Sequence, residues 1–194
     1  MVQRTVANLD DEELLHVAIQ AMQKNQHGDA IAYLKQAVEK SQKNYKALYL
    51  LAAEHAQIGL TDRAIEEFKQ TLAIEPSLAP ARFQLGLLLL CNARVEEALA
   101  ILEPLERLKD TDPYLCFKRG LECLARDDFD ACKKNIERGI ALNNANPMLN
   151  SDMQRILDLV AAHLAKGPSD PQPTAGSEEP GHFLLSAYTK GSRL

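Results

Sequence analysis

The chain has 194 residues, of which 46% are hydrophobic and 25% charged, and its net charge is −5 at pH 7. This composition predicts a globular protein of one domain or a short repeat array. Scattered Lys and Arg exclude a basic stripe for nucleic acid, and no apolar run approaches the roughly 20 residues that cross a bilayer.

The first residues also lack the apolar stretch of a signal peptide. We therefore expect a cytoplasmic protein that does not insert into membranes.

After a lead-in of residues 1–10, one pattern recurs every 34 residues. It occupies 11–44, 45–78, 79–112 and 113–146 with no insertion. The eighth place of each segment holds a small residue, which lets two helices approach closely. The repeated small and large positions are Ala18, Ala52, Gly86 and Gly120 at the eighth place, Ala30, Ala64, Ala98 and Cys132 at the twentieth, and Leu34, Phe68, Leu102 and Ile136 at the twenty-fourth.

This pattern resembles the tetratricopeptide repeat (TPR) family, most clearly in residues 61–76, where Ala64, Phe68 and Pro76 match the second half of the family motif. The resemblance implies an all-α fold, a right-handed α-solenoid of four helical hairpins that bury their apolar faces by stacking.

Two residues depart from the family pattern. Pro104 lies inside the second helix expected for the third segment, where it should bend that helix or end it early. Arg119 stands at a place that is normally apolar, and we expect it to pair with Asp127 or Asp128 because a buried cation needs a partner.

Residues 147–167 predict a capping helix that covers the last hairpin, with Ser151 and Gln154 as its capping box. Residues 168–194 are rich in Pro, Ser and Gly, which predicts a flexible tail. Within the tail, residues 183–188 (FLLSAY) form an apolar segment.

The resemblance implies a peptide-binding groove lined by the first helix of each hairpin. Transferred place by place, it predicts a groove that is apolar and partly aromatic. Its residues are Leu15, Ile19, Met22, Tyr49, Ala53, Phe83, Leu87, Leu90, Tyr114, Phe117 and Leu121, with Tyr49 and Phe83 as the clearest members. The alternative is that many of these side chains pack against the neighbouring hairpin, because a helix such as FQLGLLLL is apolar on several sides.

The predicted groove carries Lys46 and almost no other cation. It therefore lacks the charges with which some TPR proteins bind the acidic C-termini of chaperones. We expect an adaptor or chaperone that binds an apolar protein or peptide segment, similar to the TPR chaperones of bacterial secretion systems. The alternative is a structural subunit that self-associates or scaffolds a larger assembly.

The tail offers a further binding candidate. Phe183, Leu184 and Tyr188 are predicted to dock into an apolar groove, either as a pseudo-ligand or as a link to a second copy in a homo-oligomer. An incidental apolar patch in a disordered tail is the alternative.

No nucleophile with its base, phosphate-binding loop or metal-ligand cluster is visible, and the five histidines are scattered. The cysteines Cys91, Cys116, Cys123 and Cys132 lack zinc-site spacing, so we expect thiols that act as small core residues. The sequence predicts a non-enzymatic protein with no cofactor and no metal.

Overall fold

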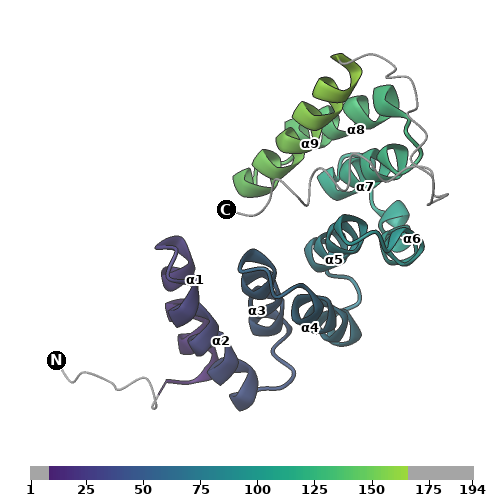
Figure 1. The fold of residues 1–194 in the computed structure, drawn as a ribbon. Coiled ribbons are helices and arrows are strands. Elements are labelled where there is room, and N and C mark those ends of the chain that lie inside the picture. The colour runs from purple at the N-terminus through teal and green to yellow at the C-terminus, as the bar shows by residue number, and fades with distance from the viewer. Residues whose placement is uncertain (1–8, 166–194) are drawn as a thin grey trace, which may run out of the picture. The chain divides into compact units, whose positions relative to one another are not determined.

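The computed structural model describes residues 9–165. Within that range every regular element is a helix (Figure 1). The predicted all-α fold is therefore confirmed.

Helices recur along the chain at a constant interval. The first helices, α1 (Asp11–Gln23), α3 (Tyr45–Gln57), α5 (Ala79–Cys91) and α7 (Pro113–Leu124), begin at residues 11, 45, 79 and 113. The second helices, α2 (His27–Lys40), α4 (Thr61–Ile74), α6 (Val95–Leu102) and α8 (Phe129–Leu142), begin at residues 27, 61, 95 and 129. Both series advance by 34 residues, which supports the proposed division of residues 11–146 into four hairpins.

The chain forms two compact units, unit 1 (Met1–Leu88) and unit 2 (Leu89–Leu194). The boundary between them falls inside α5, so it does not coincide with the end of any 34-residue segment.

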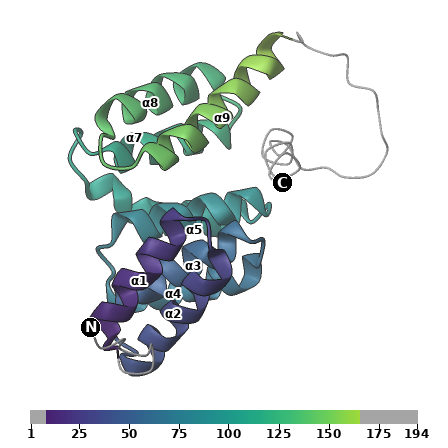
Figure 2. The ribbon, with the colours of Figure 1, turned by 90° about the vertical axis from the view of Figure 1, so that its left-hand side faces the viewer.

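In unit 1, α1 packs on α2, α2 on α3, and α3 on α4 (Figure 2). A capping box begins α1: Glu13 N donates to Asp10 Oδ1 at 2.8 Å, and Asp10 N donates to Glu13 Oε2 at 3.1 Å. One apolar cluster joins the first three helices, and its buried members are Leu14, Ala18, Ile31, Leu34, Ala37, Ala47 and Leu51.

In unit 2, α6 ends at Leu102 and is followed by the 3₁₀ helix η2 (Glu103–Arg107). Pro104 occupies the first turn of η2, where its missing N–H is tolerated. The prediction that Pro104 ends the helix early is confirmed. Beyond η2, α7 packs on α8 and α8 on α9 (Pro147–Ala165).

The last helix begins earlier than its predicted cap. Asn146 Oδ1 accepts a hydrogen bond from Leu149 N at 3.1 Å, and Pro147 follows Asn146 as the first helical residue. Ser151 lies inside α9, where its hydroxyl donates to Pro147 O at 3.2 Å. The predicted capping box of Ser151 and Gln154 is therefore wrong, because Asn146 and Pro147 already start the helix upstream of it.

Candidate functional site

The predicted groove residues differ widely in exposure. Seven of them retain side-chain surface: Leu15, Ile19, Met22, Tyr49, Ala53, Leu87 and Tyr114. Phe83, Leu90, Phe117 and Leu121 are each 0% exposed. These four side chains offer no surface to a peptide in this structure, which corrects the expectation that Phe83 is a clear groove residue.

The burial of the aromatic residues has local causes. Phe117 fills the space that Gly139 leaves on α8, since a Cβ added to Gly139 would clash with Cδ1 and Cε1 of the Phe117 ring. On α5, Phe83, Leu85, Leu89 and Leu90 are all fully buried. A helix that is apolar around most of its circumference buries several faces at once, as the alternative interpretation of FQLGLLLL expected.

Unit 1 carries an apolar stripe, defined here as Leu15, Ile19 and Met22 on α1 with Tyr49 and Ala53 on α3. Ile19 is 37% exposed, and the other four are half-buried. The Tyr49 ring leans on Phe68 of α4, with ring centroids 6.1 Å apart. Leu15 and Met22 pack against the buried cluster of unit 1, so this part of the stripe is held in place from beneath.

Two histidine–glutamate pairs connect helices of unit 1, and the glutamate of each pair is buried. His27 Nδ1 lies 2.7 Å from Glu54 Oε2, which connects α2 to α3. His55 Nδ1 lies 2.6 Å from Glu67 Oε2, which connects α3 to α4, and His55 is only 1% exposed. Each pair joins two different helices, so no short-range spacing of residues in the sequence predicts it. They satisfy buried polar groups, as stable cores require.

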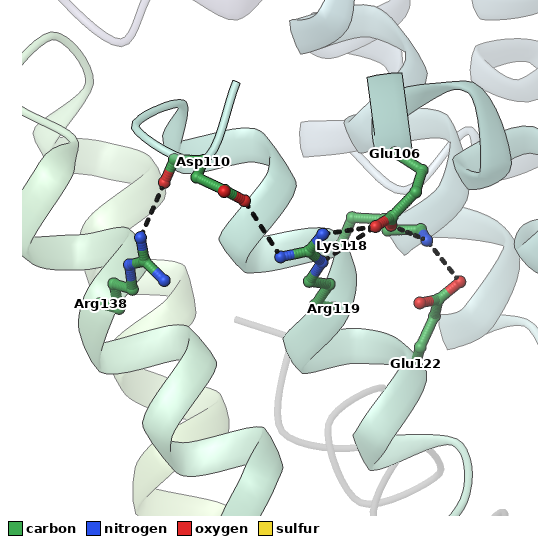
Figure 3. A network of polar contacts seen from close by, with 6 residues as sticks. All are labelled: Glu106, Asp110, Lys118, Arg119, Glu122 and Arg138. Carbon is green, nitrogen blue, oxygen red and sulfur yellow. Dashed lines mark hydrogen bonds and ion pairs between the residues drawn. The ribbon is translucent and has the colours of Figure 1, made fainter. Parts of the chain in front are cut away.

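Unit 2 contains a network of six charged residues between η2, α7 and α8 (Figure 3). Glu106 on η2 binds two cations of α7: its Oε2 lies 2.6 Å from Lys118 Nζ, and its Oε1 accepts from Arg119 Nε at 3.1 Å. Lys118 Nζ also lies 3.0 Å from Glu122 Oε1. The network thus ties η2 to α7.

Asp110, in the loop after η2, extends this network on both sides. Its carboxylate lies 3.4 Å from Arg119 Nη1, and its backbone carbonyl accepts from Arg138 Nη2 of α8 at 3.0 Å (Figure 3). The predicted pairing of Arg119 with Asp127 or Asp128 is therefore wrong. Its partners come from the preceding segment, because η2 places Glu106 against α7.

The network changes the acidity of its members. Hydrogen bonds from Arg119 and then from Lys118 lower the pKa of the Glu106 carboxyl to about 2. Burial alone would lower the pKa of Lys118, but its hydrogen bonds to Glu106 and Glu122 outweigh that effect and raise it. Glu106, Lys118 and Arg119 are therefore charged at neutral pH, and their ion pairs have a structural role.

The four cysteines are free thiols. Burial raises the pKa of Cys91 and of Cys132 to about 12, so neither forms a nucleophilic thiolate at neutral pH. Within residues 9–165, no three His, Cys, Asp or Glu side chains are placed to hold a metal ion.

A hollow of about 420 Å³ lies against α1, lined by Leu9, Glu12, Glu13, His16 and Val17. None of the predicted groove residues lines it. The tail candidates Phe183, Leu184 and Tyr188 lie outside the described residues.

Tandem helical hairpins at a 34-residue interval, with small residues where the paired helices meet, define the tetratricopeptide repeat class of folds. Comparison with solved structures confirms that class for this chain. The protein TTC0263, a thermophilic TPR protein in Thermus thermophilus, is 21% identical, with 81% of this chain and 83% of that chain covered and a TM-score of 0.64.

Two further TPR structures are similar. MamA from Desulfovibrio magneticus RS-1, from residue 41 to its end, is 18% identical, covering 80% of this chain and 92% of that chain with a TM-score of 0.57. YrrB, described as a TPR protein with an unusual peptide-binding site, is 14% identical, covering 95% and 87% with a TM-score of 0.56. At these identities the likeness establishes the fold and not a shared function.

No protein-family model matches the sequence, and no curated protein matches it significantly. Among residues 9–165, none of the helices combines the length and the apolar character that crossing a bilayer requires.

Proposed function

We propose that this chain is a non-enzymatic protein–protein interaction module, an adaptor or chaperone that binds an apolar peptide segment along the apolar stripe of unit 1. The observation that carries the proposal is the exposure of Ile19, 37% of whose surface is open, beside half-buried Leu15, Met22 and Tyr49. Such apolar side chains on consecutive first helices are suited to apolar anchors of a partner segment.

The small side chain of Ala53 supports the same proposal. Ala53 follows Tyr49 by one helical turn and is itself half-buried, so the α3 part of the stripe offers room next to the aromatic ring. A partner residue such as Leu or Phe would bury apolar surface there, and each such burial contributes about 1.5–3 kcal/mol before the costs of association. Leu87 and Tyr114 retain surface as well and stay candidates for additional contacts.

We place the protein in the cytoplasm as part of the same proposal. All four cysteines are free thiols, which is the state that cytosolic reductants maintain.

The proposal is tested by selecting peptides from a displayed random library against the chain and against two matched variants. Ile19→Asp introduces a charge on the stripe. Ile58→Asp makes the same change at a side chain that is 45% exposed but lies in the turn after α3, away from the stripe. Circular dichroism and thermal melting verify that both variants fold like the wild type.

We expect selected peptides to carry apolar anchors and to lose at least tenfold in affinity for Ile19→Asp, which corresponds to about 1.4 kcal/mol. Their affinity for Ile58→Asp should equal that for the wild type. Equal binding to wild type and Ile19→Asp, or selection of peptides without apolar anchors, would refute the proposal.

A further inference from the structure

The junction between the third and fourth hairpins is charged at places that are mostly apolar elsewhere in the chain. Because the helices begin at 34-residue intervals, residues 34 apart hold corresponding places. Glu106 corresponds to Val38, Leu72 and Ile140, Lys118 to His16, Leu50 and Gln84, and Arg119 to Val17, Leu51 and Leu85. At this junction, ion pairs therefore stand where the other segments mostly have apolar side chains.

The corresponding junction in unit 1 shows what the exchange replaces. Val38 on α2 and Leu50 on α3 both pack against the apolar cluster of unit 1, and Leu51 belongs to it with 4% exposure. In unit 2 the same places hold the ion pairs of Glu106 with Lys118 and Arg119. The two junctions are therefore stabilised by forces that respond differently to solution conditions.

Dissolved salt separates those forces. The screening length falls from about 10 Å at 0.1 M to about 3 Å at 1 M, so added salt weakens ion pairs that solvent can reach. Salt can reach the pair of Glu106 and Arg119, whose side chains are 43% and 39% exposed, but it reaches Lys118 less, because that side chain is only 7% exposed. Apolar contacts are not weakened in this way. Salt should thus loosen the η2–α7 junction and leave the α2–α3 junction intact.

The backbone hydrogen bonds of η2 contribute little stability. It is a five-residue 3₁₀ helix, a form with poorer hydrogen-bond geometry than the α-helix. Two of its side chains anchor it, and these are Glu106, which binds Lys118 of α7, and Leu105, which is 2% exposed. Opening of η2 therefore requires the loss of few contacts.

We propose that the contact between η2 and α7 is sensitive to salt. The ion pairs of Glu106 with Lys118 and Arg119 hold η2, which we call the latch, against α7, and high ionic strength releases it while α7, α8 and α9 stay folded. The latch is independent of the proposed peptide-binding stripe, which lies in unit 1. Release uncovers Leu105 and frees the loop that carries Asp110.

The test is amide hydrogen exchange of the full chain at about 0.05 M and about 1 M sodium chloride, where screening differs several-fold. Peptides covering residues 103–112 report on the latch, and peptides covering α4 correct for general effects of salt. In the wild type, exchange in 103–112 should be about tenfold faster at high salt, the effect of losing roughly 1.4 kcal/mol of local stability, with no matching change in α4.

Two variants isolate the cause. Glu106→Gln keeps the shape of the side chain but removes its charge, so its exchange in 103–112 should already be fast at low salt and should respond little to more salt. The triple variant Glu106→Leu, Lys118→Leu, Arg119→Leu makes the junction apolar, as the α2–α3 junction is, and should exchange slowly at both salt concentrations.

The exchange of residues 103–112 in the wild type and in Glu106→Gln tests the proposal without the triple variant. Salt-independent exchange of 103–112 in the wild type, an equal response in α4, or an unchanged salt response in Glu106→Gln would each overturn the proposal.

Discussion

The contact between Gly139 and the Phe117 ring yields a quantitative prediction. In Gly139→Ala, the new Cβ would clash with Cδ1 and Cε1 of a ring that is fully buried. The ring cannot retreat into solvent, so the substitution should incur the upper part of the roughly 1–3 kcal/mol that overpacking costs. Alanine regains about 1 kcal/mol of helix propensity. The net loss should be about 1–2 kcal/mol, or a Tm lower by about 2–8 °C for a chain of this size.

Thermal and urea unfolding, followed by circular dichroism, measure this loss. Gly28→Ala is the matched control, because nothing lies within 4 Å of a Cβ at that helical position; it should be neutral or stabilise by up to about 1 kcal/mol. Adding Phe117→Leu to Gly139→Ala should restore part of the stability, which a double-mutant cycle detects as coupling. A Gly139→Ala protein as stable as the wild type would show that Phe117 is not held against α8.

Three other perturbations have defined outcomes. Because the pKa of Glu106 lies below its ordinary value of 4.5, its contribution is complete above that pH and is lost as the pH falls through about 2. Glu106→Gln should therefore cost about 1 kcal/mol near pH 7, a value reduced for solvent screening, and only a small part of that near pH 2 in urea titrations. His55→Ala should cost about 3 kcal/mol, since it removes a buried ring and leaves Glu67 with only Arg63, at 3.4 Å, whereas exposed His16→Ala should cost almost nothing. If Phe183, Leu184 and Tyr188 occupy the apolar stripe, a chain ending at residue 165 should bind a peptide of residues 181–194, and Ile19→Asp should abolish that binding; light scattering of both chain lengths tests the tail as a link between copies.

The hairpin architecture could be predicted because packing repeats along the chain. The eighth and twentieth places are buried in every segment, as Ala18, Ala52, Gly86 and Gly120 and as Ala30, Ala64, Ala98 and Cys132. Close helix contacts impose small residues at a fixed period, and a fixed period is visible in one sequence.

The polar pairs could not be predicted in the same way. Glu54 and His27 are 27 residues apart, and Glu67 and His55 are 12 apart, with each pair on different helices. Asp127 and Asp128 lie close to Arg119 in the sequence of its own segment, but the partners of Arg119 come from the preceding segment. Pro104 accounts for that difference, because the 3₁₀ helix that contains it brings Glu106 to α7.

Exposure at the fifth place of a segment depends on what the second helix offers opposite it. Phe117 and Tyr49 hold the same place, 68 residues apart, yet Phe117 is fully buried and Tyr49 keeps part of its surface. Gly139 leaves a space on α8 that the Phe117 ring fills, whereas the corresponding place of α4 holds Thr71, and the Tyr49 ring lies against Phe68. The family register alone assigns both rings to a groove. Side-chain volume on the second helix separates them, and it favours unit 1 as the place where an aromatic side chain remains open to a partner.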